Sequence, residues 1–189
     1  MNLLPHFPAR RFDSRPRAAA LAAAAAVLLA AGCGAPPPDE PIDAPDLNLP
    51  EIPGGAPFSL RDALQTDADG QGRVMLVDLW ATWCVPCVAE LPHLQELSTS
   101  LPDDDFLMVG IVLESGDAED VAPFLTEHGL TYPNVMGSDE ARDSFGPFLG
   151  YPTKYLIDQN GKVIKRYFGA VGEVLNEEID RLLETGTLD

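Results

Sequence analysis

Four short stretches of the chain carry the apolar patterns of β-strands. Val74–Trp80 and Phe106–Leu113 are almost continuously apolar and contain β-branched residues, which is typical of strands buried on both faces of a sheet. The other two stretches, Thr153–Asp158 and Lys162–Phe168, are joined by Gln159-Asn160-Gly161. Because Asn-Gly between apolar runs is a strong turn signal, this pair predicts a β-hairpin.

Helical patterns occupy the segments between and after these strands. The first carries apolar residues at intervals of three, from Val88 to Leu97, which predicts one buried face. The second is expected to be capped by Ser115 or Asp117 and to end at Gly129. The four predicted helices are Val85–Ser100, Asp117–His128, Ser138–Phe145 and Glu173 to about Glu184.

The order of these elements predicts the fold class. A βαβα unit followed by ββα indicates a mixed central sheet with helices on both faces, which is a three-layer α/β fold. The domain is expected to begin near Phe58 and to continue to the end of the chain, residues 58–189. A segment of about 130 residues is large enough to bury one hydrophobic core.

The chain begins with the pattern of an export signal. Ala18–Ala31 is a run of apolar residues that follows Arg10, Arg11, Arg15 and Arg17, and a basic start before a short apolar run is typical of secretory signal peptides. The run is shorter than the roughly 20 residues that a membrane-spanning helix needs. Residues 1–32 are therefore interpreted as a signal peptide, and a buried or anchoring helix is the alternative.

Cys33 directly follows this run. Residues 28–33, Leu-Leu-Ala-Ala-Gly-Cys, resemble the lipobox of bacterial lipoproteins, in which the cysteine is lipidated and becomes the new N-terminus. The following residues, 34–57, hold eight prolines and few large apolar side chains, a composition that favours extended conformations over a packed core. Residues 33–57 are thus expected to be a lipidated tether between the membrane and the domain.

The net charge and the number of cysteines restrict the possible classes of function. The chain carries 12 basic and 30 acidic residues; removal of residues 1–32 takes away four basic residues and one acidic residue, which leaves 8 minus 29, or −21. A surface this acidic repels nucleic acid and anionic lipid headgroups, so no nucleic-acid partner is expected and membrane attachment must come from lipid on Cys33. The two remaining cysteines, Cys84 and Cys87, fit one redox pair in an oxidising compartment.

The redox pair lies where a predicted strand gives way to a helix, in Trp80-Ala81-Thr82-Trp83-Cys84-Val85-Pro86-Cys87. A thiolate at a helix N-terminus faces free backbone N–H groups and the positive end of the helix dipole, which lower its pKa. Proline in the first turn costs no hydrogen bond. The spacing lets the second sulfur reach the first, so that a mixed disulfide can be resolved within the protein.

This stretch resembles the thioredoxin superfamily, and in particular its exported TlpA- and ResA-like thiol-disulfide oxidoreductases. The resemblance covers residues 58 to about 184 and includes the WCxPC core, Glu90 followed by Pro92, Gly150-Tyr151-Pro152-Thr153 and the 156–161 hairpin. It implies that Cys84 is the exposed nucleophile and Cys87 the resolving thiol. It also implies that Pro152 is the cis-proline beside the redox pair, which helps to hold the substrate backbone.

Further site residues follow from the same resemblance. Asp78 matches the buried acid that handles the proton of the resolving thiol, and its apolar neighbours favour burial over a solvent-facing position. Thioredoxin pairs this acid with a lysine on the neighbouring strand, whereas Phe106–Leu113 contains no lysine. Glu90, one helical turn after Cys87, matches an acid that modulates cysteine acidity, with a solvated helix charge as the alternative. The expected substrate-binding residues are Trp83, Val85, Pro86, Tyr151 and Pro152, and Trp80 belongs either to the active-site wall or to the core.

Other chemistries lack their ligands or motifs. Cys84 and Cys87 supply only two sulfurs, without a second CxxC or a suitably spaced His pair, so no metal site is expected. Haem attachment needs a histidine where Val88 stands, and the residues before Cys84 lack the peroxiredoxin pattern. No cofactor beyond the Cys84–Cys87 disulfide is therefore expected, and His93 and His128 are interpreted as surface helix residues.

Three functional hypotheses remain. The first is a membrane-tethered dithiol reductase of exported proteins, for which the resemblance implies apocytochrome c as the substrate class and a membrane electron donor of the DsbD/CcdA type. The second is a disulfide-forming oxidase. The third is a lipid-anchored binding or chaperone module whose CxxC is incidental, which the combination of Cys84, Cys87, Pro152 and Asp78 disfavours.

Overall fold

The computed structural model describes residues 41–65 and 72–188. By its contacts the chain divides into two units, residues 1–38 and 39–189, and all described residues belong to the second. The expected signal peptide and the lipid-bearing Cys33 lie outside the described residues. Within the described ranges, none of the helices combines the length and the apolar character that crossing a membrane requires.

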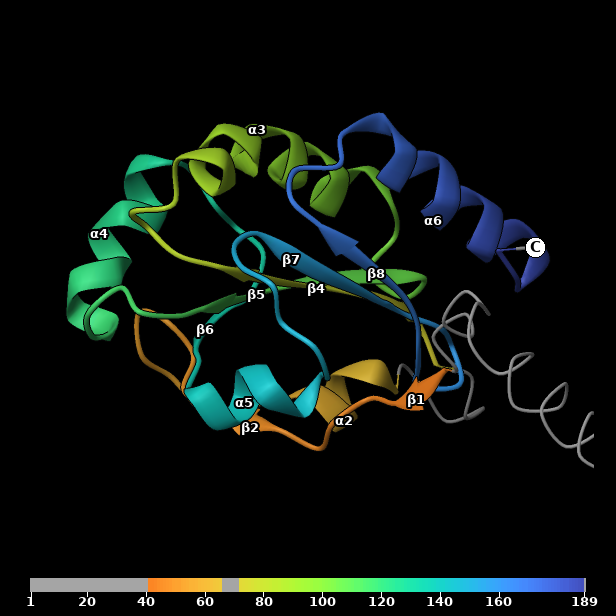
Figure 1. The fold of residues 1–189 in the computed structure, drawn as a ribbon, viewed down its shortest axis with the longest axis horizontal. Helices are drawn as coiled ribbons and strands as arrows, with labels where there is room; N and C mark the ends of the chain where they lie inside the picture. Colours follow the sequence, from red (N-terminus) through yellow and green to blue (C-terminus); the bar gives the residue numbers. More distant parts are fainter. Residues whose placement is uncertain (1–40, 66–71, 189) are drawn as a thin grey trace, which may run out of the picture. The chain divides into compact units, whose positions relative to one another are not determined.

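A six-stranded mixed sheet forms the middle of this unit, in the order β1-β8-β7-β4-β5-β6 (Figure 1). Strands β4, β5 and β6 are parallel, whereas β7 is antiparallel to both β4 and β8. A separate two-stranded sheet pairs β2 with β3. The strands are β1 Ile42–Asp43, β2 Asn48–Leu49, β3 Phe58–Ser59, β4 Val74–Trp80, β5 Phe106–Val112, β6 Asn134–Met136, β7 Thr153–Ile157 and β8 Lys162–Phe168.

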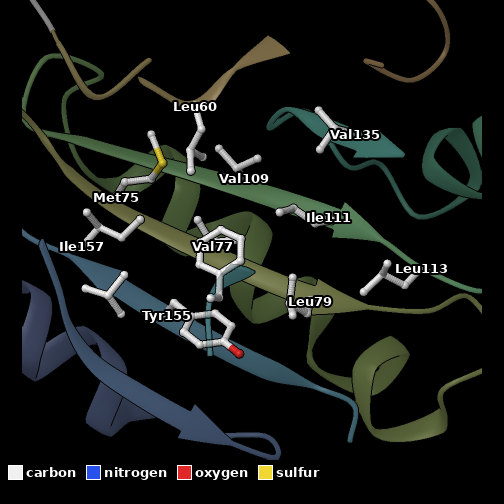
Figure 2. Close-up of a cluster of buried hydrophobic side chains, with 12 residues drawn as sticks. Leu60, Met75, Val77, Leu79, Val109, Ile111, Leu113, Val135, Tyr155 and Ile157 are labelled. Carbon is white, nitrogen blue, oxygen red and sulfur yellow. The ribbon is translucent and has the colours of Figure 1, made fainter. Parts of the chain in front are cut away.

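The central strand β4 is apolar on both faces because both faces are covered. Every residue of Val74–Trp80 is buried, as expected for a strand in the middle of a three-layer sheet. Met75, Val77 and Leu79 project into one cluster of apolar side chains, shown in Figure 2. The alternate residues Val74 and Leu76 enter a second cluster on the other face.

Helices cover both faces of the sheet (Figure 1). Side chains of α3 and α6 pack against the face of Val74 and Leu76, and α4 joins α3 in the cluster around Trp80. Leu60 of α2 and Phe145, directly after α5, pack against the opposite face. The helices are α2 Leu60–Leu64, α3 Val85–Ser100, α4 Ala118–Glu127, α5 Asp139–Ser144 and α6 Glu173–Thr185.

The N-terminal part of this unit differs from the sequence prediction. Residues 41–57 were expected to belong to the tether, but Ile42 pairs with Val163 of β8 and the N–H of Ile52 donates to the carbonyl of Asn134 at 2.8 Å. Ile52 is also buried among residues of α3 and α4. The packed unit therefore begins before Phe58. The prolines permit this arrangement because the segment needs only a few backbone donors to make these contacts.

The predicted fold class, a three-layer α/β fold with a mixed sheet, is confirmed. The main predicted strands and helices are present with shifts of at most one residue at their ends. Capping explains one such shift: Asp117 is the N-cap of α4, where its carboxylate accepts from the backbone of Glu119 and Asp120. The elements that were not predicted, α2 and strands β1, β2, β3 and β6, are all of five residues or fewer.

Candidate active site

A disulfide at the start of α3 forms the centre of the candidate site. Cys84 is the N-cap of α3, its Sγ accepts from the backbone N–H of Cys87 at 3.3 Å, and the two sulfurs are bonded. Pro86 lies in the first helical turn, where its missing N–H has no consequence. Cys84 is 5% exposed and Cys87 is 1% exposed, so Cys84 is the sulfur that a partner reaches first.

Apolar side chains stand exposed around this disulfide. Trp83 is 58% exposed and Val85 is 78% exposed, on either side of Cys84. Large exposed apolar side chains next to a reactive group indicate a surface that contacts another molecule. The surface next to Cys84 therefore carries three of the residues that are expected to bind substrate: Trp83, Val85 and Pro86.

The loop before β7 completes the rim of the site. The peptide bond between Tyr151 and Pro152 is cis. The ring of Tyr151 packs edge-on against Trp83, with the ring centroids 5.5 Å apart. The carbonyl of Pro152 accepts from the N–H of Gly169 at 2.8 Å, which fixes this loop to the end of β8. The structure thus brings together the two segments that the sequence marked, 83–87 and 150–153.

Two acids and a lysine form a buried cluster beneath these segments. Lys154 Nζ lies 2.6 Å from Glu90 Oε2 and 3.4 Å from Asp78 Oδ1, and all three side chains are buried. The other carboxylate oxygen of Glu90 accepts from the backbone N–H of Val171 at 2.9 Å. Each oxygen of Glu90 therefore has a donor, whereas Asp78 Oδ1 has no hydrogen bond from the described residues and only the longer ion pair with Lys154. A buried carboxylate with so few donors holds its proton more tightly.

The pKa of Asp78 follows from this arrangement. Burial raises the pKa from 3.8 to about 6, the positive charge of Lys154 offsets part of that rise, and the negative charge of Glu90 adds to it. A carboxyl group with a pKa of about 6 can accept and release a proton near neutral pH. Its position on β4, six residues before Cys84, suits the proton-handling role that the resemblance implied.

Lys154 is the functional candidate that the sequence analysis missed. The resemblance to thioredoxin points to Phe106–Leu113, the parallel neighbour of β4, as the place for a lysine partner of Asp78. The lysine instead comes from the antiparallel neighbour β7, where Lys154 pairs in register with Asp78. The available signal was a lysine within an otherwise apolar predicted strand, two residues after Pro152, because a fully buried lysine requires an acidic partner.

Comparison with known proteins identifies the family. The family model described as Redoxin matches residues 43–183. The chain belongs to the Redoxin family. The region matched by the family model begins within β1, in agreement with the packed position of residues 41–57.

Named relatives in this family are redox proteins. The chain is 33% identical to the thiol:disulfide interchange protein HelX of Rhodobacter capsulatus over 78% of each chain. It is 32% identical to the thiol-disulfide oxidoreductase ResA of Geobacillus thermodenitrificans over 75% of each chain. It also resembles the crystal structure of a putative thiol:disulfide interchange protein DsbE from Chlorobium tepidum, with a TM-score of 0.65, 28% identity, and coverage of 77% of this chain and 98% of that one. This Redoxin-family chain is a thiol-disulfide oxidoreductase of the ResA and HelX kind.

Trp80 belongs to the core of this Redoxin-family fold. It is fully buried, and its indole N–H donates to Asn134 Oδ1 at 3.2 Å. Gly110 leaves the space for that bond, since a Cβ there would lie 2.2 Å from Asn134 Oδ1. Of the two interpretations of Trp80, the structure supports the core position, and Trp83 alone of the two tryptophans faces outward.

Three further residues at the rim carried no motif in the sequence. Leu149 is exposed three residues before Pro152, and Phe168 is exposed where β8 pairs with Thr153. Glu114, after β5, accepts the indole N–H of Trp83 on its backbone carbonyl at 2.7 Å. The described ranges contain no group of three or more His, Cys, Asp or Glu side chains placed to hold a metal ion.

Proposed function

We propose that this protein is an extracytoplasmic, lipid-anchored dithiol reductase of exported proteins. The observation that supports the reducing direction is the distribution of charged groups around the disulfide. The cluster under α3 contains two carboxyl groups and one lysine, and the two residues between the cysteines, Val85 and Pro86, carry no charge. The helix N-terminus is then the only evident group that stabilises a thiolate on Cys84 within the described structure.

This charge distribution favours the reducing direction. A disulfide is a strong oxidant when its reduced form is stabilised, as it is where the thiolate has a very low pKa. A site with excess buried acid and without a cation between its cysteines stabilises the thiolate less. The reduced form is therefore less stable, and the dithiol passes its electrons on more readily.

The proposed reaction uses Cys84, Cys87 and Asp78. The Cys84 thiolate attacks one sulfur of a substrate disulfide, which forms a mixed disulfide and releases the first substrate thiolate. Asp78, in its carboxylate form, takes the proton from Cys87. The Cys87 thiolate then attacks Cys84 Sγ, which releases the second substrate thiolate and leaves the Cys84–Cys87 disulfide. The substrate gains two electrons, and a membrane dithiol donor of the DsbD/CcdA type restores the protein.

The substrate surface is the rim around Cys84. Trp83 and Val85 flank the nucleophile and are exposed, and Tyr151, the residue before Pro152, contacts Trp83 from the neighbouring loop. Exposed apolar groups around a single reachable sulfur suit a polypeptide whose cysteine lies in an unfolded segment. Exported apocytochrome c, which carries two cysteines in a CxxCH segment, is the substrate class we propose.

The proposal of a lipid anchor on Cys33 is based on the sequence. The basic and apolar pattern of residues 1–32, followed by Cys33, supports export and lipidation. Labelling cells with a radioactive fatty acid tests this step, because the wild-type protein is expected to carry the label and C33A is not. Equal labelling of both proteins would refute an anchor on Cys33.

The redox direction is tested by equilibrating the protein with glutathione buffers and measuring the reduction potential, with C84S as the control. A value near that of thioredoxin, about −270 mV, is expected for a reductase. A value near about −120 mV would identify an oxidase. The absence of reversible exchange would favour a binding module. C87S should in addition accumulate mixed disulfides through Cys84, since the second attack is lost.

A further inference from the structure

Lys154 faces two buried acids but donates a hydrogen bond to only one of them. On the sheet, Lys154 of β7 stands directly opposite Asp78 of β4, and residues opposite each other on antiparallel strands have Cβ atoms about 5 Å apart. Asp78 is therefore the partner that the register favours. Lys154 Nζ nevertheless donates to Glu90 Oε2 at 2.6 Å and lies 3.4 Å from Asp78 Oδ1, which has no hydrogen bond from the described residues.

The carboxylate of Glu90 is fixed in the place where it meets the lysine. Glu90 lies on α3 and is 6% exposed. Its Oε1 accepts from the backbone N–H of Val171 at 2.9 Å, which leaves Oε2 for Lys154. Val171 belongs to the connection between β8 and α6, and this connection is itself held, because the N–H of Gly169 donates to the carbonyl of Pro152 at 2.8 Å. A backbone amide in a fixed loop thus orients Glu90, and Glu90 orients Lys154.

Within the described ranges, no other charged group around Asp78 competes for the lysine. The residue opposite Asp78 on β5 is Gly110, which has no side chain. Tyr132, just before β6, is buried, and burial together with the charges of Asp78 and Glu90 raises its pKa, so the phenol stays neutral. The charges that act on Asp78 are those of Lys154 and Glu90. The position of Lys154 between the two acids therefore depends on Glu90.

The sharing of one lysine between two acids determines how well Asp78 can accept a proton. A carboxylate that is paired closely with a cation has a pKa lowered by about 1 to 3 units, which makes it a weaker base. With Lys154 bonded to Glu90, burial outweighs the attraction to the lysine, and the pKa of Asp78 is about 6. A lysine bonded to Asp78 instead would leave a carboxylate less able to take a proton from a thiol.

We propose that Glu90 is a positioning residue for proton transfer, which holds Lys154 away from Asp78 and so keeps Asp78 available as the base for Cys87. The inference rests on the proton step of the proposed function and adds the group that prepares this step. It differs from a direct effect of the Glu90 charge on the cysteines, because it requires Lys154.

The test follows the titration of Asp78 in the oxidised protein, in which the two cysteines carry no protons. The ¹³C signal of the Asp78 carboxyl group is recorded from pH 3 to pH 9 and assigned with D78N. The wild type is expected to titrate near pH 6. E90D keeps the negative charge but is one methylene shorter, so it cannot hold Lys154 in the same place, and the midpoint should fall by about one pH unit or more.

Two further variants frame this result. E90Q should lower the midpoint as well, because the single acceptor oxygen of glutamine cannot serve both Val171 and Lys154. E96Q removes an exposed charge from the same helix, and as the matched control it should leave the midpoint unchanged. An E90D midpoint equal to that of the wild type would overturn the proposal, because it would show that Glu90 acts through its charge alone.

The route through Lys154 is tested with K154M. Without the lysine, E90D should no longer shift the midpoint of Asp78, and a shift of the same size in that background would refute the positioning role. In a protein that carries a mixed disulfide at Cys84, E90D should also slow the release of the bound thiol by Cys87 at pH 7. An unchanged release rate despite a lowered midpoint would show that Asp78 is not the base. The titration needs no substrate, so a wild type that does not exchange disulfides would refute the proposed function, whereas an unshifted titration would refute this inference.

Discussion

Replacement of Asp78 by asparagine should make the protein more stable at neutral pH. The folded protein raises the pKa of Asp78 from 3.8 to about 6, so the native state binds the proton more tightly than the unfolded state does. Ionisation of Asp78 therefore costs folding free energy. Two pKa units correspond to about 3 kcal/mol. Asparagine has a similar shape and no charge to ionise, and Lys154 keeps Glu90 as its partner at 2.6 Å.

The stability difference between D78N and wild type depends on pH, because Asp78 loses its proton at a higher pH in the folded state than in the unfolded state. Below about pH 4, Asp78 is protonated in both states, and D78N and wild type should have equal stability. Between pH 4 and pH 6 the unfolded chain loses its proton first, so the wild type becomes progressively less stable than D78N. Above pH 6 the difference should be constant at about 3 kcal/mol.

Urea unfolding of the oxidised proteins from pH 4 to pH 8, followed by tryptophan fluorescence, measures this difference. The expected result is a higher urea midpoint for D78N at pH 8 that converges with wild type at pH 4. A lower stability of D78N at pH 8 would show that the carboxylate is a net stabilising partner of Lys154. A difference that does not depend on pH would show that Asp78 does not titrate in this range, and either result would refute the reasoning.

Three other substitutions test separate parts of the structure. K154M removes the cation that lowers the pKa of Asp78, so the pH dependence of disulfide exchange should shift to higher pH, as measured by rates from pH 5 to pH 9. G110A should lower the free energy of unfolding by about 3 kcal/mol, because its Cβ would lie 2.2 Å from Asn134 Oδ1; chemical denaturation measures it. I52A should cost about 3 kcal/mol by loss of a buried side chain, and an unchanged stability would place this residue outside the folded unit.

The long elements of the fold could be predicted because their patterns are local. The buried run of β4, the apolar face of α3 and the Asn-Gly turn before β8 each identify an element without knowledge of the rest of the chain. Strands β1, β2 and β6 have two or three residues each. They exist only through their partners, and no local pattern distinguishes such short pieces from loop. Residues 41–57 resembled a tether for the same reason.

The site residues likewise divide into those with a local sequence signal and those without one. Cys84, Cys87 and Pro152 belong to motifs, and the contact of Trp83 with Tyr151 joins the two segments that carry them. The partner of Asp78 could not be read from spacing, because cross-strand register decides that Lys154 faces it. Glu114 shows the limit most clearly. Its left-handed backbone and the bond of its carbonyl to Trp83 are products of tertiary structure, and its position in the sequence, between a strand and a helix cap, carries no signal.

The path of residues 41–53 along both borders of the sheet affects whether copies of the protein can join their sheets. This segment pairs with β8 at one border of the six-stranded sheet through Ile42. It returns at the opposite border, where Glu51 bridges Val135 of β6 and the carbonyl of Pro50 accepts from Met136. Open borders of a sheet are templates on which another chain can add a strand. One short stretch with four prolines therefore covers part of both borders, and because proline has no backbone N–H, it offers a neighbouring copy few donors on which to add a strand.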